Sequence, residues 1–282
     1  MLVKEDSMKK FILNADDLAK SEFHNKAVLD GYNKGLLLST SIMANMPFYD
    51  EAINLVVKTC PNLSVGVHLN IIEGKSLIPH LNLLVDNNDN FNNGYLKLLL
   101  KSQDKNFLLQ VEKEFRAQIE KCLKDFTPTH LDSHVHVHSI PEIFKIVVKL
   151  ASEYNIKQIR TQAEIPYFTK EDKYNPINFI KVLLLNYFSI QNKVLIKKNN
   201  LQTNDYLIGV GYTGMMNSNT LVEGLRKIKK DCVVEALIHP KKYPDDKKDS
   251  HSIEFEITQD LMTKDIIETL GFKITNYKEN MI

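Results

Sequence analysis

Short apolar runs and stretches of helical periodicity alternate along the whole chain. This alternation predicts βαβ units that build a parallel sheet covered by helices. Predicted strands lie at 11–13, 36–43, 63–70, 130–138, 158–161, 206–211, 232–238 and 272–275. Predicted helices lie at 23–35, 47–58, 107–124, 141–154, 177–190, 218–230 and 258–269. Seven or eight such strands are enough to close a barrel.

The length of 282 residues fits one α/β barrel, which commonly needs about 250 residues. We therefore expect a single barrel domain over residues 1–282, built of seven or eight mainly parallel strands. Two segments, 71–106 and 162–204, are expected as loop insertions. The first of them gathers Asn, Asp and Gly between residues 82 and 94, which is typical of a long loop beside a substrate site.

Polar side chains stand where several predicted strands end. Asp16 and Asp17 follow the first strand, and His68 lies near the end of the third. Arg160 and His239 end two later strands. Barrels and open α/β sheets place their chemistry at this edge. One aspartate could instead cap the helix that follows. Two adjacent carboxylates point in different directions, however, and can take different roles.

Four of the nine histidines lie in the segment 130–138, which we interpret as one strand. Its polar face would carry alternate residues, namely His130, Asp132, His134, His136 and His138. Five side chains at this spacing span about 26 Å, so one or two at most can belong to a single metal site. Neutral imidazole is the commonest metal ligand. A histidine-rich exposed edge would show the same pattern.

The composition excludes several classes of partner. Thirty-six basic residues balance thirty-five acidic ones, for a net charge of +1, so no nucleic acid or anionic membrane partner is expected. Cys60, Cys122 and Cys232 form neither a disulfide framework nor a CxxC motif, which fits a reducing, cytoplasmic location. We expect no secretory segment and no apolar stretch near the roughly 20 residues of a membrane span.

The candidate residues suit metal-assisted hydrolysis of an amide or ester. One carboxylate and two imidazoles can hold a divalent ion and leave positions open for water and substrate. A second carboxylate can take the proton of the water, and a separate histidine can protonate the leaving amine. The parts would come from Asp16, Asp17, His68, His134 and His239. No nucleotide-binding glycine motif and no covalent-nucleophile signature supports another chemistry.

Three separated motifs resemble those of the YdjC-like carbohydrate deacetylases, which include chitooligosaccharide deacetylases. They are Asn14–Asp17, Gly66–Leu69 and Thr129–His138. Two later elements, Ile159-Arg160 and Ile238-His239-Pro240, are also similar. In the family the first motif usually continues with Phe-Gly, whereas this chain continues with Leu18-Ala19.

The resemblance implies a distorted (β/α) barrel related to polysaccharide deacetylases. It implies that Asp17, His68 and His134 bind the metal, and that Asp16 is the general base. His239 would be the general acid, and Arg160 would orient Asp16. The other polar residues of the histidine segment would support the site from behind or face the substrate; they are His130, Asp132, His136 and His138.

The resemblance also implies Mg²⁺, although two histidine ligands equally suit Zn²⁺ or another transition metal. The implied substrates are N-acetylated sugars, typically short β-linked N-acetylglucosamine oligomers. Family members also form homodimers, of which the residues themselves give no sign.

Two other functions fit parts of the pattern. A metal-dependent phosphoesterase or amidohydrolase also uses His-x-His pairs, but usually on the first strand, where this chain has Asp16 and Asp17. A non-catalytic sugar-binding regulator would keep the metal site without turnover. The presence of candidates for both base and acid argues against the regulator.

Overall fold

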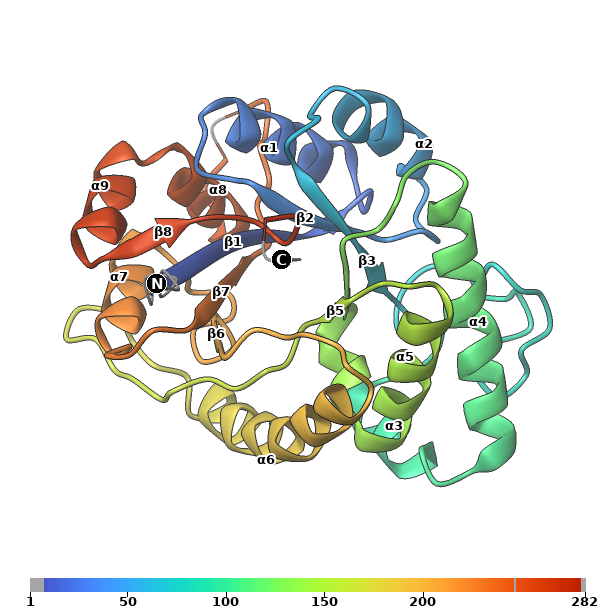
Figure 1. Ribbon diagram of the computed structural model, residues 1–282. Helices are drawn as coiled ribbons and strands as arrows, with labels where there is room; N and C mark the ends of the chain where they lie inside the picture. The colour runs from blue at the N-terminus through green and yellow to red at the C-terminus, as the bar shows by residue number, and fades with distance from the viewer. Residues whose placement is uncertain (1–7, 246, 280–282) are drawn as a thin grey trace, which may run out of the picture.

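A curled sheet of eight strands, in which every strand pair is parallel, forms the centre of the molecule (Figure 1). The computed structural model describes residues 8–245 and 247–279. The strands are β1 (Lys9–Leu18), β2 (Ser39–Ile42), β3 (Ser64–Leu69), β4 (His130–Ser133), β5 (Gln158–Ile159), β6 (Tyr206–Ile208), β7 (Val233–Ile238) and β8 (Phe272–Ile274). Their order is β5-β4-β3-β2-β1-β7-β6, and β8 pairs with the first half of β1.

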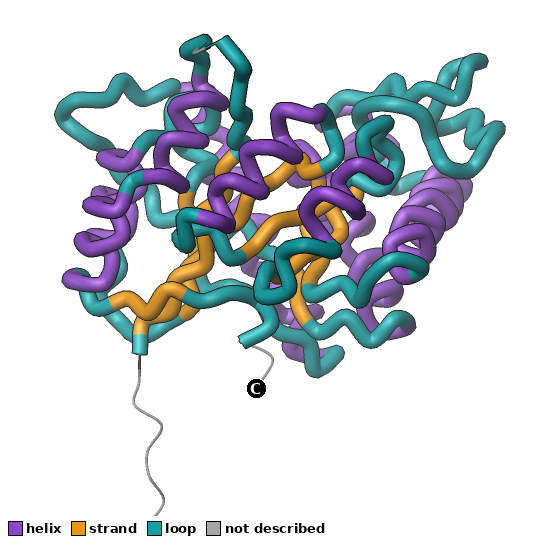
Figure 2. The backbone as a smooth tube through the Cα atoms, turned by 90° about the horizontal axis from the view of Figure 1, so that it is seen from above, coloured by secondary structure: helices purple, strands orange, loops and turns teal. Residues whose placement is uncertain are grey.

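Helices enclose the strands (Figure 2). They are α1 (Glu22–Asn33), α2 (Tyr49–Ala52), η1 (Ile53–Val57), α3 (Tyr95–Lys101), α4 (Lys105–Leu123), η2 (His134–Ser139), α5 (Pro141–Glu153), α6 (Pro176–Lys198), α7 (Ser218–Arg226), α8 (Ser250–Gln259) and α9 (Leu261–Thr269). The predicted α/β barrel class is confirmed. The prediction succeeded because strands that are buried on both faces of a parallel sheet appear in the sequence as short, nearly continuous apolar runs.

The curled sheet comes close to closing between its two edge strands. Gln158 of β5 forms an isolated parallel bridge with Gln202, and the amide of Ile159 donates to the carbonyl of Gln202 at 3.0 Å. Further along, the amide of Leu207 in β6 donates to the carbonyl of Ala163 at 2.7 Å. Extended segments beside β5 and β6 therefore bridge the gap. The result is a distorted barrel. Because its strands are parallel, their carboxyl ends all lie on the same side of it.

The histidine segment departs from the predicted nine-residue strand. β4 ends at Ser133, and Val135 and His136 take left-handed backbone angles, with φ of 53° and 57°. The neighbouring strand β3 pairs with β4 only as far as Ser133, and β5 only as far as Leu131. A strand without partners on either side would leave its backbone groups unpaired, so the chain turns there. Alternation of side chains ends at the same point.

Several helix predictions also change. α3 forms inside the expected 71–106 loop, and the predicted helix 258–269 is two helices, separated at Asp260, whose side chain caps the second. α6 extends over 23 residues and is, by length and composition only, long and apolar enough for a membrane span, with one third of its most apolar part buried inside the protein. The expectation that no such stretch exists is therefore wrong.

Candidate active site

A pocket of about 460 Å³ opens at the carboxyl ends of the strands. β1 contributes Asp16 and Asp17 to its lining, and β7 is followed by His239. The turn after β4 contributes His134 and His136. These five predicted residues come from three strands that are distant in sequence. The parallel sheet brings them together because its strands all end at the same edge.

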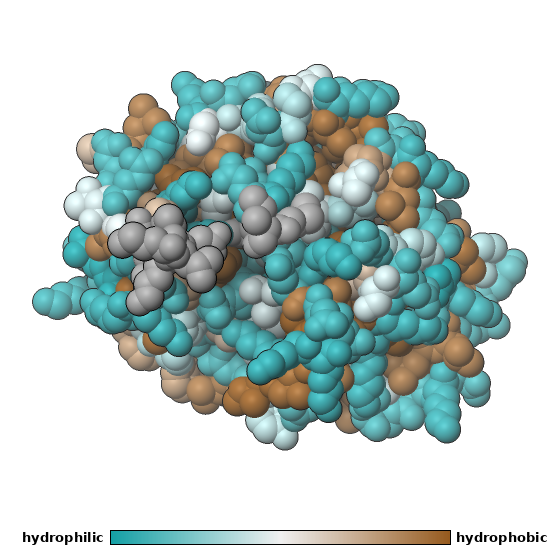
Figure 3. Space-filling view, viewed as in Figure 1, coloured by the Kyte–Doolittle hydropathy of each residue, from teal (hydrophilic) through white to brown (hydrophobic). Residues whose placement is uncertain are grey.

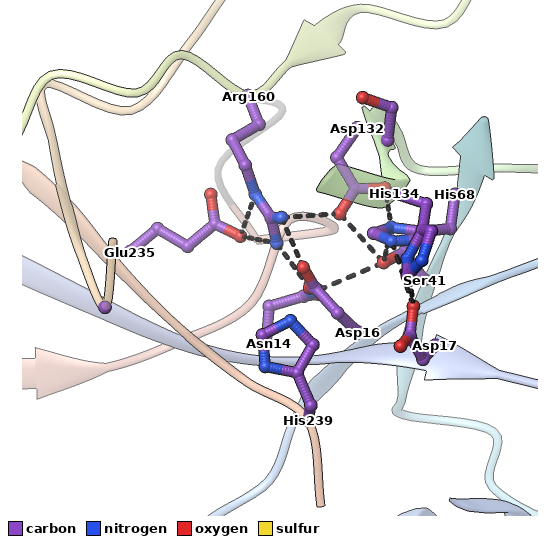
Figure 4. Close-up of polar contacts among 12 residues, drawn as sticks. Asn14, Asp16, Asp17, Ser41, His68, Asp132, His134, Arg160, Glu235 and His239 are labelled. Atoms are coloured by element: carbon purple, nitrogen blue, oxygen red, sulfur yellow. Dashed lines mark hydrogen bonds and ion pairs between the residues drawn. The ribbon is translucent and has the colours of Figure 1, made fainter. Parts of the chain in front are cut away.

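The two adjacent aspartates of β1 serve different neighbours. Asp17 has φ of 66°, and the register between β1 and β2 shifts between Ala15 and Leu18. A shift of this kind turns successive side chains away from strict alternation. As a result, Asp16 faces the Arg160 side of the barrel and Asp17 faces the histidines (Figure 4).

Asp17, His68 and His134 form a compact group in which one ligand atom of each lies within 4.8 Å of the others. The Oδ1 atom of Asp17 is 2.9 Å from Nδ1 of His134 and 3.3 Å from Nε2 of His68. All three come from the ends of β1, β3 and β4. Two imidazoles and one carboxylate are a donor set that holds divalent metals, and Asp17 and His134 also line the pocket.

A second group of side chains fixes the orientation of His68. The Nδ1 atom of His68 lies 2.8 Å from Oδ1 of Asp132 and 3.0 Å from Oγ of Ser41. The hydroxyl of Ser41 also donates to Asp132 at 2.8 Å. These contacts leave Nε2 as the ring nitrogen that faces Asp17. A carboxylate behind a ligating histidine commonly sets its tautomer and raises its basicity as a ligand.

Arg160 is fully buried and contacts three carboxylates. Its Nη1 and Nη2 atoms each lie 2.7 Å from an oxygen of Asp16, in a bidentate pair. Nη2 lies 2.6 Å from Glu235, and Nη1 lies 2.9 Å from Asp132. Burial opposes ionisation of Asp16, but the guanidinium holds the pKa of that carboxyl below its usual value. Asp16 is therefore an anion that cannot rotate freely.

Asp16, His68 and Asp132 form a second group of possible metal ligands. Both aspartates already contact the guanidinium of Arg160, so a metal ion there would face a buried positive charge at short range. Of this second group only Asp16 lines the pocket. The group around Asp17 is the better candidate, because Asp17 and His134 both reach the pocket.

His239 faces the pocket with a carboxylate behind it. Its Nδ1 atom lies 3.3 Å from Oε2 of Glu254, and its backbone amide donates to the same oxygen. Burial opposes protonation of the ring, but Glu254 stabilises the charged form and raises the pKa of His239 to about 9. The imidazole is thus held as a proton donor near neutral pH. The carbonyl of His239 also lies 2.7 Å from Nδ1 of His251.

A match to a family model shows to which family the chain belongs. The model of the family described as YdjC-like protein matches residues 10–269, which includes Asp16, Asp17, His68, His134, Arg160 and His239. The chain belongs to the YdjC-like family.

Curated relatives of this YdjC-like protein match about half of its chain. The carbohydrate deacetylase of Clostridium beijerinckii is 38% identical over 148 residues, which are 52% of this chain and 58% of the relative. The carbohydrate deacetylase of Thermoanaerobacter pseudethanolicus is 37% identical over 152 residues, which are 53% of this chain and 59% of the relative. The matched part is thus less than two thirds of either relative.

A solved structure matches the whole fold of the YdjC-like protein. It is a protein of Enterococcus faecalis V583 named for cellobiose-phosphate cleavage, with a TM-score of 0.76 and 22% identity. The match covers 98% of this chain and all of that one. The peptidoglycan deacetylase PdaC of Bacillus subtilis matches with a TM-score of 0.43 and 13% identity, over 96% of this chain and 89% of that one.

The remaining residues of the histidine segment separate into two layers. His130 is fully buried, with its ring stacked on that of Tyr277 at 3.8 Å between centroids. His138 is fully buried beside Gln162 and the carbonyl of Arg160. Neither of them lines the pocket, and Asp132 does not line it either. His136 alone of the four lines the pocket, and its Nδ1 atom is buried without a partner among the described residues.

Besides Ser41, four residues that the sequence did not single out support the site: Glu73, Glu235, Glu254 and Tyr277. Glu254 supports His239, and Glu235 accepts from Arg160 and from the hydroxyl of Tyr277. The fourth, Glu73, lies 3.3 Å from Nε2 of His134, a contact that lowers the pKa of Glu73 to about 2. Glu235 had a visible signal, because it is a lone carboxylate within the apolar run 232–238. The others come from loops and helices without a pattern.

Proposed function

We propose that this YdjC-like protein is a metal-dependent carbohydrate deacetylase that removes N-acetyl groups from short acetylated sugars. The observation that carries the proposal is the separation of roles at the end of β1. Asp17 belongs to the possible metal ligands, whereas Asp16 is held by Arg160 at the pocket wall. The names of the matched relatives support the same activity.

The residues around Asp17 fit a divalent metal ion. Asp17, His68 and His134 would hold it, with His68 kept in place by Asp132. A bound divalent ion lowers the pKa of a coordinated water and polarises an acyl oxygen. Two nitrogen donors suit Zn²⁺ or another transition metal, whereas Mg²⁺ prefers oxygen donors. The resemblance favours Mg²⁺, and adding back each metal singly distinguishes the two.

Asp16 and His239 are the proposed acid–base pair. Asp16 accepts the proton of the attacking water, and the fixed guanidinium of Arg160 keeps this carboxylate ionised and oriented. His239 gives its proton to the amine that leaves, and Glu254 keeps the ring protonated until then. Both side chains line the same pocket, as a shared substrate requires. Proper placement of the two groups supplies the orientation that the reaction needs.

Acetate release from N,N′-diacetylchitobiose tests this proposal directly. The protein is stripped of metal, and Mg²⁺, Zn²⁺, Co²⁺ or Ni²⁺ is added back singly. We expect release that depends on the metal and is lost in Asp16→Asn. Calorimetric titration of the metal should still show binding to Asp16→Asn and none to His68→Ala. Release of phosphate from phosphorylated sugars without release of acetate would overturn the proposal, as would sugar binding without turnover in any metal.

A further inference from the structure

One face of α6 exposes large apolar side chains that the barrel leaves uncovered. We call it the outer face of α6; it consists of Ile177, Ile180, Leu183, Tyr187, Ile190 and Val194. Each of them is between 51 and 70% exposed. Figure 3 shows apolar side chains gathered along the lower edge of the molecule, where Figure 1 places α6. Scattered apolar residues are normal on a protein surface, but a continuous row on one helix marks a binding surface.

The opposite face of α6 fixes the helix on the protein. Val182, Leu185 and Phe188 form a buried cluster with Leu207 and Val210 of the β6 region. Tyr95 and Leu99 of α3 pack against the same cluster, so α3 lies beside α6. On α3, Leu96 and Leu100 are also exposed, at 67 and 72%. α6 is therefore held on the protein by one face, while its outer face is apolar and exposed, which suits a helix that lies along an apolar boundary.

The charged side chains of α3 and α6 themselves all have one sign. α3 and α6 carry six lysines and no Asp or Glu; the lysines are Lys97, Lys101, Lys181, Lys193, Lys197 and Lys198. Among the residues that the structure describes, none of these six forms an ion pair. Two copies meeting on this face would bring lysines together without any carboxylate of either helix to pair them, and such like-charge contact is unfavourable. An anionic partner is favoured instead.

We propose that the outer face of α6, together with α3, docks on an anionic lipid bilayer. The apolar side chains enter the boundary between headgroups and acyl chains, and the lysines meet the anionic headgroups. Tyr187 has the apolar ring and polar tip that suit this depth. α6 lies along the surface and does not cross the membrane, because Val182, Leu185 and Phe188 remain in the core.

The pocket opens beside this surface. Lys181 and Leu184 of α6 both line the pocket, and Leu184 is 36% exposed. Docking would therefore place the pocket mouth near the headgroup layer. This proposal departs from the expectation of no membrane partner, which rested on the net charge. Net charge averages over the whole chain, whereas the lysines of α3 and α6 gather on one side.

Sedimentation of the full chain with lipid vesicles tests the proposal. We expect binding to vesicles that contain phosphatidylglycerol, weaker binding to phosphatidylcholine alone, and loss of binding as salt is raised. The double variant Ile180→Asp/Ile190→Asp should bind at least about tenfold more weakly, because two exposed isoleucines no longer enter the apolar layer. Lys197→Glu/Lys198→Glu should lose binding to the anionic vesicles.

The matched control is Leu261→Asp/Met262→Asp on α9, where both side chains are exposed, at 60 and 74%. It makes the same change in charge away from α6 and should bind as the unaltered protein does. Failure of the unaltered protein to bind phosphatidylglycerol vesicles would overturn the proposal. So would a dimer in light scattering that Ile180→Asp/Ile190→Asp converts to monomers, since the face would then join two copies. Release of acetate from a soluble disaccharide tests the proposed activity separately.

Discussion

The guanidinium of Arg160 contacts both carboxylate oxygens of Asp16 at 2.7 Å, across 144 residues of sequence. A bidentate pair of this kind has only one good geometry, so the carboxylate has a fixed direction at the pocket wall. Asp132 and Glu235 share the same guanidinium. Arg160 therefore connects the candidate base, Asp16, to Asp132, which holds the proposed metal ligand His68.

Replacing Arg160 should affect activity and stability to different degrees. Arg160→Lys keeps the charge but loses the bidentate geometry, and kcat for acetate release should fall at least about tenfold. Arg160→Met removes the guanidinium that three buried carboxylates share, and should lower the free energy of unfolding by about 3–5 kcal/mol. Denaturant titration measures the second effect. Unchanged kcat in Arg160→Lys would contradict the orienting role.

Asp132→Asn should weaken metal binding although Asp132 is not among the proposed ligands. Asp132 holds Nδ1 of His68, and loss of such a partner typically costs about 10–100-fold in metal affinity. Ser41→Ala removes a weaker contact to the same nitrogen and should cost less. Calorimetric titration with the activating metal measures both. Asp16→Asn is the control, since it should leave the affinity nearly unchanged; an equal loss there would favour the group formed by Asp16, His68 and Asp132.

Glu254→Gln should move the alkaline limit of activity toward lower pH. The proposed acid His239 must be protonated, so kcat/KM falls as the pH rises through its pKa, which Glu254 raises to about 9. Glutamine still offers an oxygen to the backbone amide of His239 but no charge to the ring. The pH profile of acetate release measures the shift. An alkaline limit that stays in place would argue that another group donates the proton.

Glu164→Gln should flatten the dependence of stability on pH. Glu164 is buried, accepts the amides of Gly209 and Gly211, and burial raises its pKa to about 7 from an ordinary value of 4.5. The folded protein therefore holds this proton more tightly than the unfolded chain does. Its stabilising effect is complete below about pH 4.5 and is lost as the pH rises through 7, by about 3 kcal/mol in total.

Denaturant titrations between pH 5 and 8 measure this slope. The variant should lose less stability than the unaltered protein over that range. Glu256→Gln, at an exposed position on α8, is the matched control and should keep the original slope. An unchanged slope in Glu164→Gln would show that other groups cause the pH dependence.

The general architecture followed from the sequence because its signal is local. Apolar runs and helical periodicity are properties of adjacent residues, so the order of strands and helices was predictable. Parallel strands end at one edge, so Asp16, Asp17, His68, Arg160 and His239 could be expected near one another. Their gathering in space agrees with that expectation, whereas the division into ligands, base and acid stays a prediction.

The histidine segment shows where local reasoning failed. Its alternation of polar and apolar residues is typical of a strand, yet the chain turns at Val135 and His136. The length of β4 depends on how far β3 and β5 run beside it, and their ends lie some 60 residues before and 30 residues after it. Of the four residues predicted to support the site or face the substrate, only His136 lines the pocket; the others are His130, Asp132 and His138.

Sequence alone predicted the class of fold, the edge at which the candidate site lies and the residue types proposed to carry its chemistry. Tertiary structure decided which partners those residues have: Glu254 behind His239, Glu235 and Tyr277 behind Arg160, and the exposed outer face of α6. The physical reason is range. Periodicity and strand ends are encoded in neighbouring residues, whereas a buried ion pair or an uncovered helix face depends on segments brought together only by the folded chain.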